Sequence, residues 1–366
     1  MASGSPARLT VHHHARCGIV PPYLLRRLAQ VEDPRFARAA EGARLSLLRD
    51  APFRALREQY ELPPRRSATT APPSARPGFP DRAVSDAEGR EQLPGRLVRS
   101  EGDPPTADDA VNEAYDGMGA TYDLFWSEFG RDSVDGNGLP LASTVHYGTL
   151  YENAFWAGDR LVFGDGDGQV FNRFTLSLSV IGHELVHGVT QFTADLVYED
   201  QSGALNESIS DVFGALVEQH ARGQAVTEAT WLIGEGLFTD QVQGRALRSM
   251  RAPGTAFNDD VLGKDPQVAS MADFVVTDDD NGGVHLNSGI PNRAFYLVAD
   301  SLGGRAWESA GQIWYDTLTS GELDRRVNFA GFAAATLRAA ETRFGSASAE
   351  EDAVQAAWET VGVVVR

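Results

Sequence analysis

The spacing of apolar residues divides the front of the chain into a helical segment followed by a polar gap. Residues 19–61 predict two helices, because apolar side chains recur there with helical spacing. Pro21 and Pro22 suit the first turn of a helix, where a missing backbone N–H loses no hydrogen bond. Residues 62–84 are rich in Pro, Ser and Arg, and they predict a linker that is open to proteolytic cutting.

Beyond the gap, strand-like and helical patterns first alternate, and then helical patterns take over. Short stretches at 97–99 and 143–147 predict strands, and residues 106–129 predict a helix with Thr106 as its N-cap. From about residue 176 to the end, apolar positions follow helical spacing almost throughout. The chain therefore has a mixed part followed by a helical part.

This order predicts an α+β protein with two lobes behind a small helical front segment. We expect the helical front segment over residues 1–61 and the linker over 62–84. A β-rich N-terminal lobe is expected over 85–193, ending in a helix, and an α-helical C-terminal lobe over 194–366. Ligand sites often lie in the cleft between two such lobes.

Charge is distributed unevenly along the 366 residues, which carry 32 basic and 51 acidic side chains and a net charge of −19. Residues 1–66 hold 12 arginines against 6 acidic residues, and the remainder holds 20 basic against 45 acidic residues. A basic arm that binds nucleic acid is one interpretation. Docking of the arm onto the acidic body of the same chain explains its apolar helical spacing better, and the body's charge excludes a DNA-binding surface.

Other features of the whole sequence bear on the cellular compartment but do not determine it. No apolar stretch reaches the roughly 18 residues that a membrane span requires, so we expect no membrane partner. The single cysteine, Cys17, excludes an internal disulfide framework. No signal peptide is recognisable, which predicts a cytoplasmic protein or one exported by a non-standard route.

The strongest chemical signal is the H-E-L-V-H motif, His183 to His187, in an amphipathic segment. Two histidines four residues apart project from the same helix face, and their imidazoles suit one zinc ion. Glu184 lies beside such an ion, where it can accept a proton from a water molecule.

A second helix strengthens the prediction of a metal site. Glu207 follows His187 by 20 residues, and a turn between the two helices would bring it back beside the histidines. Two histidines and one carboxylate leave a fourth position open, as catalytic zinc requires. Asp211, one turn after Glu207, can accept the free ring N–H of a ligand histidine.

Three motifs together resemble the thermolysin family of zinc metallopeptidases. They are H-E-L-V-H, N-E-S-I-S-D and, at 280–292, D-N-G-G-V-H-L-N-S-G-I-P-N, and the resemblance covers about residues 85–366. The segment C-G-I-V-P-P-Y-L-L at 17–25 resembles the protealysin branch, whose members carry a short propeptide. The resemblance implies a zinc-dependent neutral endopeptidase, made as a self-processing zymogen, with one catalytic Zn²⁺, a zinc site between the lobes and the front segment as propeptide.

Matching positions imply roles for individual residues. The zinc ligands would be His183, His187 and Glu207, and Glu184 would be the general base. Tyr198 and His285 would bind the oxyanion of the tetrahedral intermediate, with Asp280 orienting His285, and Asp211 would support a ligand histidine. Each distal residue also has an ordinary structural interpretation, as a core tyrosine, a turn histidine or a surface cation.

Substrate contacts follow from the same resemblance. Arg248 would bind the carbonyl just after the scissile bond, and Asn153 and Ala154 would hold the substrate backbone as an added strand. An apolar pocket would favour hydrophobic residues after the cut, although core packing explains its members equally well. Its matching positions are Phe171, Phe174, Val180, Ile233 and Leu247. Structural Ca²⁺ is doubtful, because Ser179 stands where the family's paired calcium site has a carboxylate, while Glu218 and Glu235 match other ligands.

The front segment has two possible inhibitory mechanisms. In the favoured one, the I-V-P-P-Y region lies in or beside the cleft and resists cleavage because proline lacks a backbone N–H. In the other, the Cys17 thiolate or His12 to His14 occupies the open zinc position. The expected partners are therefore protein or peptide substrates and the chain's own propeptide in cis. A catalytically silent zinc-binding peptide scaffold and a dedicated intracellular processing protease remain alternatives.

Overall fold

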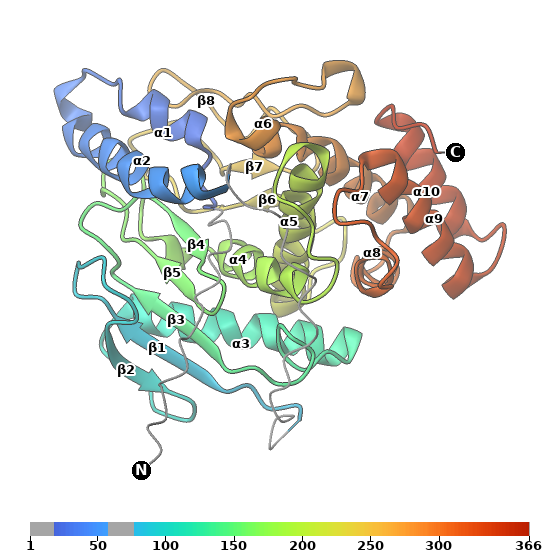
Figure 1. Ribbon diagram of the computed structural model, residues 1–366, viewed down its shortest axis with the longest axis horizontal. Coiled ribbons are helices and arrows are strands. Elements are labelled where there is room, and N and C mark those ends of the chain that lie inside the picture. The colour runs from blue at the N-terminus through green and yellow to red at the C-terminus, as the bar shows by residue number, and fades with distance from the viewer. Residues whose placement is uncertain (1–17, 58–76, 366) are drawn as a thin grey trace, which may run out of the picture.

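The front segment lies across the N-terminal lobe and reaches the centre of the molecule in the computed structural model (Figure 1). The structure describes residues 18–57 and 77–365, with side chains over 18–50 and 77–365. The described front segment forms α1 (Pro22–Leu28), the 3-10 turn η1 (Pro34–Phe36) and α2 (Ala37–Arg57). Its two predicted helices are thus present, and Pro22 is the first residue of α1. Cys17, His12 to His14 and most of the predicted linker lie outside the described residues.

The N-terminal lobe is built on a five-stranded mixed sheet with the strand order β2-β1-β3-β5-β4. The strands are β1 (Arg82–Asp86), β2 (Arg96–Ser100), β3 (Leu141–Val145), β4 (Ala154–Trp156) and β5 (Leu161–Phe163). The pairs β1–β3 and β3–β5 are parallel, while β1–β2 and β4–β5 are antiparallel. Because β1 begins at Arg82, the lobe starts slightly before the predicted boundary at residue 85. Strand β4 lies at the sheet edge and presents its outer backbone groups to another segment.

Helix α3 (Asp109–Phe129) packs against this sheet, and its N-cap differs from the prediction. Asp108, not Thr106, is the N-cap, since its Oδ1 accepts the N–H groups of Ala110 at 2.9 Å and Val111 at 3.4 Å. Thr106 accepts the N–H of Asp108 at 3.2 Å and stabilises the turn that precedes the helix. Both residue types cap helices well, so the sequence pattern alone did not separate them.

Two long helices form the centre of the molecule and connect the lobes. Helix α4 (Leu178–Gln191) lies against α5 (Asp200–Arg222), and Figure 1 shows the pair between the sheet and the C-terminal helices. Glycines permit the close approach: a Cβ on Gly182 would lie 3.1 Å from the Cα of Gly214, and one on Gly214 only 2.5 Å from the Ser179 carbonyl oxygen. Side chains on the facing surfaces of α4 and α5 are therefore brought close together.

The C-terminal lobe is α-helical, as predicted. Its later helices are α6 (Asp280–Asn287), α7 (Gly289–Leu302), α8 (Ala310–Thr319), α9 (Phe329–Phe344) and α10 (Ala349–Thr360). Short 3-10 turns and two-stranded ladders complete the fold, namely η2 (Phe174–Leu176), η3 (Met271–Asp273), β6 (Leu232–Ile233) with β7 (Arg248–Ser249), and β8 (Asn258–Asp259) with β9 (Gly263–Lys264). Stacked Trp314 and Trp358, with ring centroids 6.2 Å apart, form part of its core. Within the described ranges, no helix is both long and apolar enough to cross a bilayer.

A histidine held between two carboxylates connects the sheet to the start of α3. His146 follows β3, and its Nδ1 lies 2.9 Å from an Asp165 oxygen while its Nε2 lies 2.9 Å from Asp108 Oδ2. These hydrogen bonds, opposed by partial burial, raise the pKa of His146 to about 9. The imidazolium therefore links the α3 N-cap to the loop after β5 at neutral pH.

We expect His146→Asn to lower the melting temperature at about pH 6 and to have much less effect at about pH 10. A raised pKa in the folded chain stabilises it fully below the ordinary histidine pKa, and this contribution is lost as pH rises through about 9. Asparagine tolerates the backbone φ of 54° at this position, so the substitution tests the charge. Thermal unfolding of both chains at the two pH values measures the effect, and an equal difference at both would contradict it.

Candidate metal and active site

Three buried side chains from α4 and α5 converge on one point. The Nε2 atoms of His183 and His187 lie 3.1 Å apart, and each lies 3.6 Å from an oxygen of Glu207. One ligand atom from each of the three residues lies within 4.8 Å of the others. His183 and Glu207 are fully buried, and His187 is 8% exposed. Such a convergence of two imidazoles and one carboxylate is the donor set of a catalytic zinc site.

The Nδ1 atoms of both histidines already have hydrogen-bond partners, and these contacts orient the two Nε2 atoms toward a metal. His183 Nδ1 lies 2.8 Å from Asp211 Oδ1, and His187 Nδ1 lies 2.9 Å from Asn206 Oδ1. Ser210 Oγ is also 3.1 Å from His187 Nδ1. With Nδ1 donating to these acceptors, each Nε2 carries a lone pair directed at the common point. The residues present therefore fit a zinc ion.

Asp211 joins the three converging side chains to Arg248 and Asn292. Besides His183, its carboxylate accepts two hydrogen bonds from Arg248, both at 2.8 Å, and one from Asn292 at 2.8 Å. Although burial acts in the opposite direction, Arg248 and His183 lower the pKa of Asp211 to about 2. A charged carboxylate thus fixes both the orientation of His183 and the position of the Arg248 guanidinium.

Glu184 lies next to the ligand His183 on α4. It is fully buried, and no side-chain donor lies within hydrogen-bond distance of its carboxyl oxygens among the described residues. Burial first, and then the nearby Glu207 carboxylate, raise its pKa well above the ordinary value, against a smaller opposing effect of the Trp156 backbone N–H. A buried carboxyl that no side chain holds, beside a metal site, is suited to accepting and returning a proton.

Tyr198 and His285 both lie beside the Glu207 carboxylate. The Tyr198 hydroxyl donates to a Glu207 oxygen and is 3.5 Å from His285 Nε2. Asp280 lies 2.8 Å from His285 Nδ1 and also accepts its backbone N–H at 3.0 Å. Against the effect of burial, the carboxylates of Asp280 and Glu207 raise the pKa of His285. Tyr198 and His285 can therefore both present donors to an oxygen atom near the metal point.

The front segment adds a short strand to the exposed edge of β4. Gly18 forms an antiparallel bridge with Phe155, and the Ile19 N–H donates to the Ala154 carbonyl at 3.0 Å. The Asn153 side chain contacts the next residue twice, accepting the Val20 N–H at 2.9 Å and donating to its carbonyl at 3.5 Å. These contacts make Asn153 and Ala154 a docking edge for an extended peptide.

Arg248 binds the same strand from the other side. Its guanidinium donates to the Ile19 carbonyl at 3.0 Å while it remains paired with Asp211. Ile19 is fully buried, and its apolar cluster includes Phe174, Val180 and Leu247, which are at most 1% exposed. Phe171 and Ile233 belong to the same cluster, which is the main core and runs through both lobes. The expected pocket positions are therefore apolar and buried, as is the side chain of the docked strand.

Family models and relatives agree with this geometry. Residues 81–191 match the model of the thermolysin metallopeptidase catalytic domain, and residues 194–363 match that of its alpha-helical domain. An extracellular metalloprotease of Pectobacterium carotovorum subsp. carotovorum is 57% identical over 289 residues, which cover 79% of this chain and 83% of the relative. The chain belongs to the thermolysin family of metallopeptidases.

Two further relatives span the front segment as well. The extracellular minor metalloprotease of Serratia marcescens is 40% identical over 351 residues, 93% of this chain and 92% of the relative. The solved precursor of protealysin, a metalloproteinase from Serratia proteamaculans, is 50% identical with a TM-score of 0.85. That comparison covers 95% of this chain and 100% of the precursor. The predicted similarity to the protealysin branch is confirmed, as are the two-lobed thermolysin-like fold, the metalloendopeptidase class and the zinc cofactor.

The structure assigns other partners to the positions that match the paired calcium site of the thermolysin family. The hydroxyl of Ser179 accepts the Gly234 N–H at 3.2 Å. Glu218 forms an ion pair with Arg222, one turn later on α5, at 2.6 Å. An arginine thus supplies positive charge beside a carboxylate that matches a calcium ligand.

Two asparagines near the zinc site were not identified from the sequence. Asn206 accepts from His187, and Asn292 donates to Asp211. Both lie inside the motifs that carry the family resemblance, Asn206 directly before Glu207 and Asn292 at the end of G-I-P-N. Their positions in these motifs were the available signal, but their partners depend on how the helices pack.

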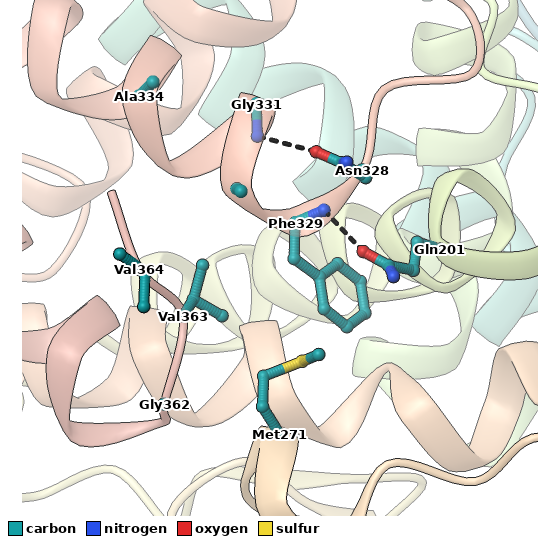
Figure 2. Close-up of a pocket in the computed structure, with 10 residues that line it drawn as sticks. Gln201, Met271, Asn328, Phe329, Gly331, Ala334, Gly362, Val363 and Val364 are labelled. Atoms are coloured by element: carbon teal, nitrogen blue, oxygen red, sulfur yellow. Dashed lines mark hydrogen bonds between the residues drawn. The ribbon is translucent and has the colours of Figure 1, made fainter. Parts of the chain in front are cut away.

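A cavity of about 450 Å³ lies between the start of α9, the start of α5 and the last described residues (Figure 2). At its edge, the Gln201 side-chain oxygen accepts the Phe329 N–H. Among the described residues, its lining contains no titratable side chain: Gln201, Met271, Asn328, Phe329, Ala330, Gly331, Ala334, Gly362, Val363 and Val364. This described lining therefore offers no acid or base, unlike the α4–α5 cluster.

We expect Asn206→Ala to weaken zinc binding about tenfold, because His187 loses an acceptor that fixes its ring and tautomer. Competition against a chelator of known affinity measures the zinc dissociation constant of each chain. Ser210→Ala is the matched control, since it tests the other group near His187 Nδ1. Unchanged affinity in the double variant would show that neither contact orients this ligand.

Proposed function

We propose that this chain is a neutral zinc endopeptidase made as a self-processing zymogen, which cuts peptide bonds that precede hydrophobic residues. The observation that carries the proposal is the strand 18–20, which lies along β4 with the Ile19 carbonyl on Arg248. The family resemblance implies that Arg248 binds the carbonyl of the substrate residue just after the scissile bond. By that assignment, Ile19 occupies the position of the residue after the cut.

The chain's own residues have distinct roles in this proposal. Zinc, when bound by His183, His187 and Glu207, supplies a Lewis acid and activates water. Glu184 accepts the proton of the attacking water and returns it to the leaving nitrogen. Asp211 and Asn206 act indirectly, because they orient the ligand histidines.

Stabilisation of the developing oxyanion is the proposed role of two further side chains. Tyr198 and His285 present neighbouring donors beside Glu207, and Asp280 fixes the ring of His285 through Nδ1. Donors held in place before the reaction lower the barrier because they need no reorganisation as charge develops.

Specificity for hydrophobic residues follows from the surroundings of Ile19. The proposed pocket residues Phe174, Val180 and Leu247 are apolar and buried, as is the Ile19 side chain itself. A substrate with Leu, Ile, Val or Phe at this position would bury a comparable apolar surface away from water.

Inhibition by the front segment is supported by contacts well beyond the zinc site. Arg26 pairs with Asp279 at 3.1 Å, and Arg27 donates to the Asp260 carbonyl at 2.7 Å. Arg49 contacts Glu91 at 2.6 Å. The basic arm thus docks on the acidic body, with Pro21 offering no N–H after the docked strand. The alternative of a Cys17 thiolate on zinc concerns a residue outside the described ranges.

We assign residues 1–61 to the propeptide and place the maturation cut in the linker 62–84. The mature enzyme would comprise the two lobes that the sequence assigns to 85–193 and 194–366, the first of which begins at Arg82 in the structure. Relatives that are named extracellular support export of this chain. Glu184, Tyr198 and His285 favour an enzyme over a silent scaffold, because a peptide-holding scaffold needs neither a base nor oxyanion donors.

Self-processing predicts that wild type loses its N-terminal segment and digests casein at neutral pH, whereas Glu184→Ala does neither. Removal of a general base lowers the rate by about 10²–10⁴-fold or more. Intact mass and casein cleavage are followed together, with and without 1,10-phenanthroline. Zinc-loaded wild type that remains intact and inactive would contradict self-processing, and persistent inactivity after removal of the front segment by another protease would favour the silent scaffold.

Latency is expected to depend on the Ile19 side chain. Ile19→Ala removes buried methyl groups and weakens docking by about 2–5 kcal/mol, the usual cost of such a truncation. We therefore expect faster loss of the front segment than in wild type, measured from the time course of intact mass. Ile19→Leu, which keeps the apolar volume, is the control and retains latency. Equal rates for Ala and Leu would contradict the assignment of Ile19 to the pocket.

A further inference from the structure

Helix α2 docks on the N-terminal lobe through several polar contacts. Gln169 Oε1 accepts the backbone N–H groups of Arg38 and Ala39 at 2.9 and 3.1 Å, at the start of the helix. Two turns further on, the Ser46 hydroxyl accepts the Glu152 N–H at 2.9 Å. The interface therefore satisfies backbone groups on both sides.

At the centre of this interface lies the side chain of Glu152, which is fully buried. Gly42 on α2 lies directly over it, so that a Cβ at Gly42 would be only 2.3 Å from Glu152 Oε1. No described donor group lies within hydrogen-bond distance of either carboxyl oxygen. The propeptide helix thus helps to cover a carboxyl group whose charge no donor compensates.

The charged groups around Glu152 do not offset its burial. Asp167, 2% exposed, is the neighbouring carboxyl, and it accepts three backbone N–H groups of its own loop, at 2.6, 2.7 and 3.0 Å. Burial, and then the Asp167 charge and a hydrogen bond to the Asp167 side chain, raise the pKa of Glu152 well above its ordinary value. The docked interface therefore favours the neutral form of Glu152.

Other titratable groups at this interface have partners elsewhere. On α2, Asp50 accepts from the Tyr151 hydroxyl at 2.9 Å and from Asn153 Nδ2 at 3.3 Å. Arg49 on the same helix directs its guanidinium to Glu91 and to the Thr149 carbonyl. In the loop after β5, Asp165 pairs with His146.

We propose that docking of α2 takes up one proton on the Glu152 carboxyl, so that the propeptide is held more weakly as pH rises. When α2 leaves, the atoms over the carboxyl leave with it, and water stabilises the ionised form. Below the ordinary pKa of a carboxyl, docking carries no ionisation cost. Above it, the docking constant falls with pH until the raised pKa of the docked state is reached. This inference rests on the proposal that the front segment is a propeptide.

The test is hydrogen exchange of α2 amides in the full zinc-loaded chain carrying Glu184→Ala, which prevents self-cleavage. We expect α2 protection, corrected for intrinsic exchange, to fall by up to about tenfold per pH unit between about pH 5.5 and 8.5. Amides of α10, which lies in the other lobe, serve as the internal reference. If α2 protection in this chain, which keeps Glu152, does not depend on pH, that result alone overturns the proposal.

Two variants identify the group responsible. Glu152→Gln keeps the shape but stays neutral, so we expect its α2 protection to be independent of pH. Asp50→Asn, at the same interface, should lower α2 protection but leave its change per pH unit as it is in the chain with Glu152 and Asp50. If Glu152→Gln also leaves the change per pH unit unaltered, the proton lies on another group and the proposal is overturned. Hydrogen exchange does not require peptidase turnover. The result can therefore be interpreted even if the peptidase or self-processing assays fail.

Discussion

The buried charge of Asp211 is the constraint on which the site depends. An isolated carboxylate in a protein interior is costly, so it must be surrounded by donors. Here the donors are a zinc-ligand histidine, the arginine that holds the docked strand, and an asparagine of α7. Metal binding and peptide binding therefore share one electrostatic support. Loss of Asp211 would leave a buried guanidinium without its counter-ion and a ligand ring without its acceptor.

Close packing of α4 against α5 makes this arrangement possible. The glycines at 182 and 214 bring the two backbones within contact distance, and the facing side chains then meet at fixed positions. A larger residue at either position would separate the helices and move Glu207 away from the histidines. Small residues in the middle of the helices are thus as important to the zinc site as the ligands themselves.

Much of the fold and of the zinc site could be predicted because their signals are local. Helical periodicity, the spacing within H-E-L-V-H and the turn before Glu207 each involve residues close in sequence. The start of the N-terminal lobe at Arg82 was less predictable, since β1 exists through its pairing with β2 and β3. The acceptor role of Asn206 and the contact of Gly42 with Glu152 join different elements, and no local pattern indicates them.

The contact between Gln169 and the start of α2 bears on whether release of the front segment can be reversed. In the first turn of this helix, the Ala37 N–H bonds to the Pro34 carbonyl, but the Arg38 and Ala39 N–H groups take their acceptor from the other side of the interface. Helices in water gain most of their stability from packing, and uncapped first turns fray. Once detached, the propeptide would lose its cap together with its packing surface and unwind into an extended chain. An unwound chain is readily digested, so in the proposed zymogen the contact that holds the front segment in place would also make its loss irreversible.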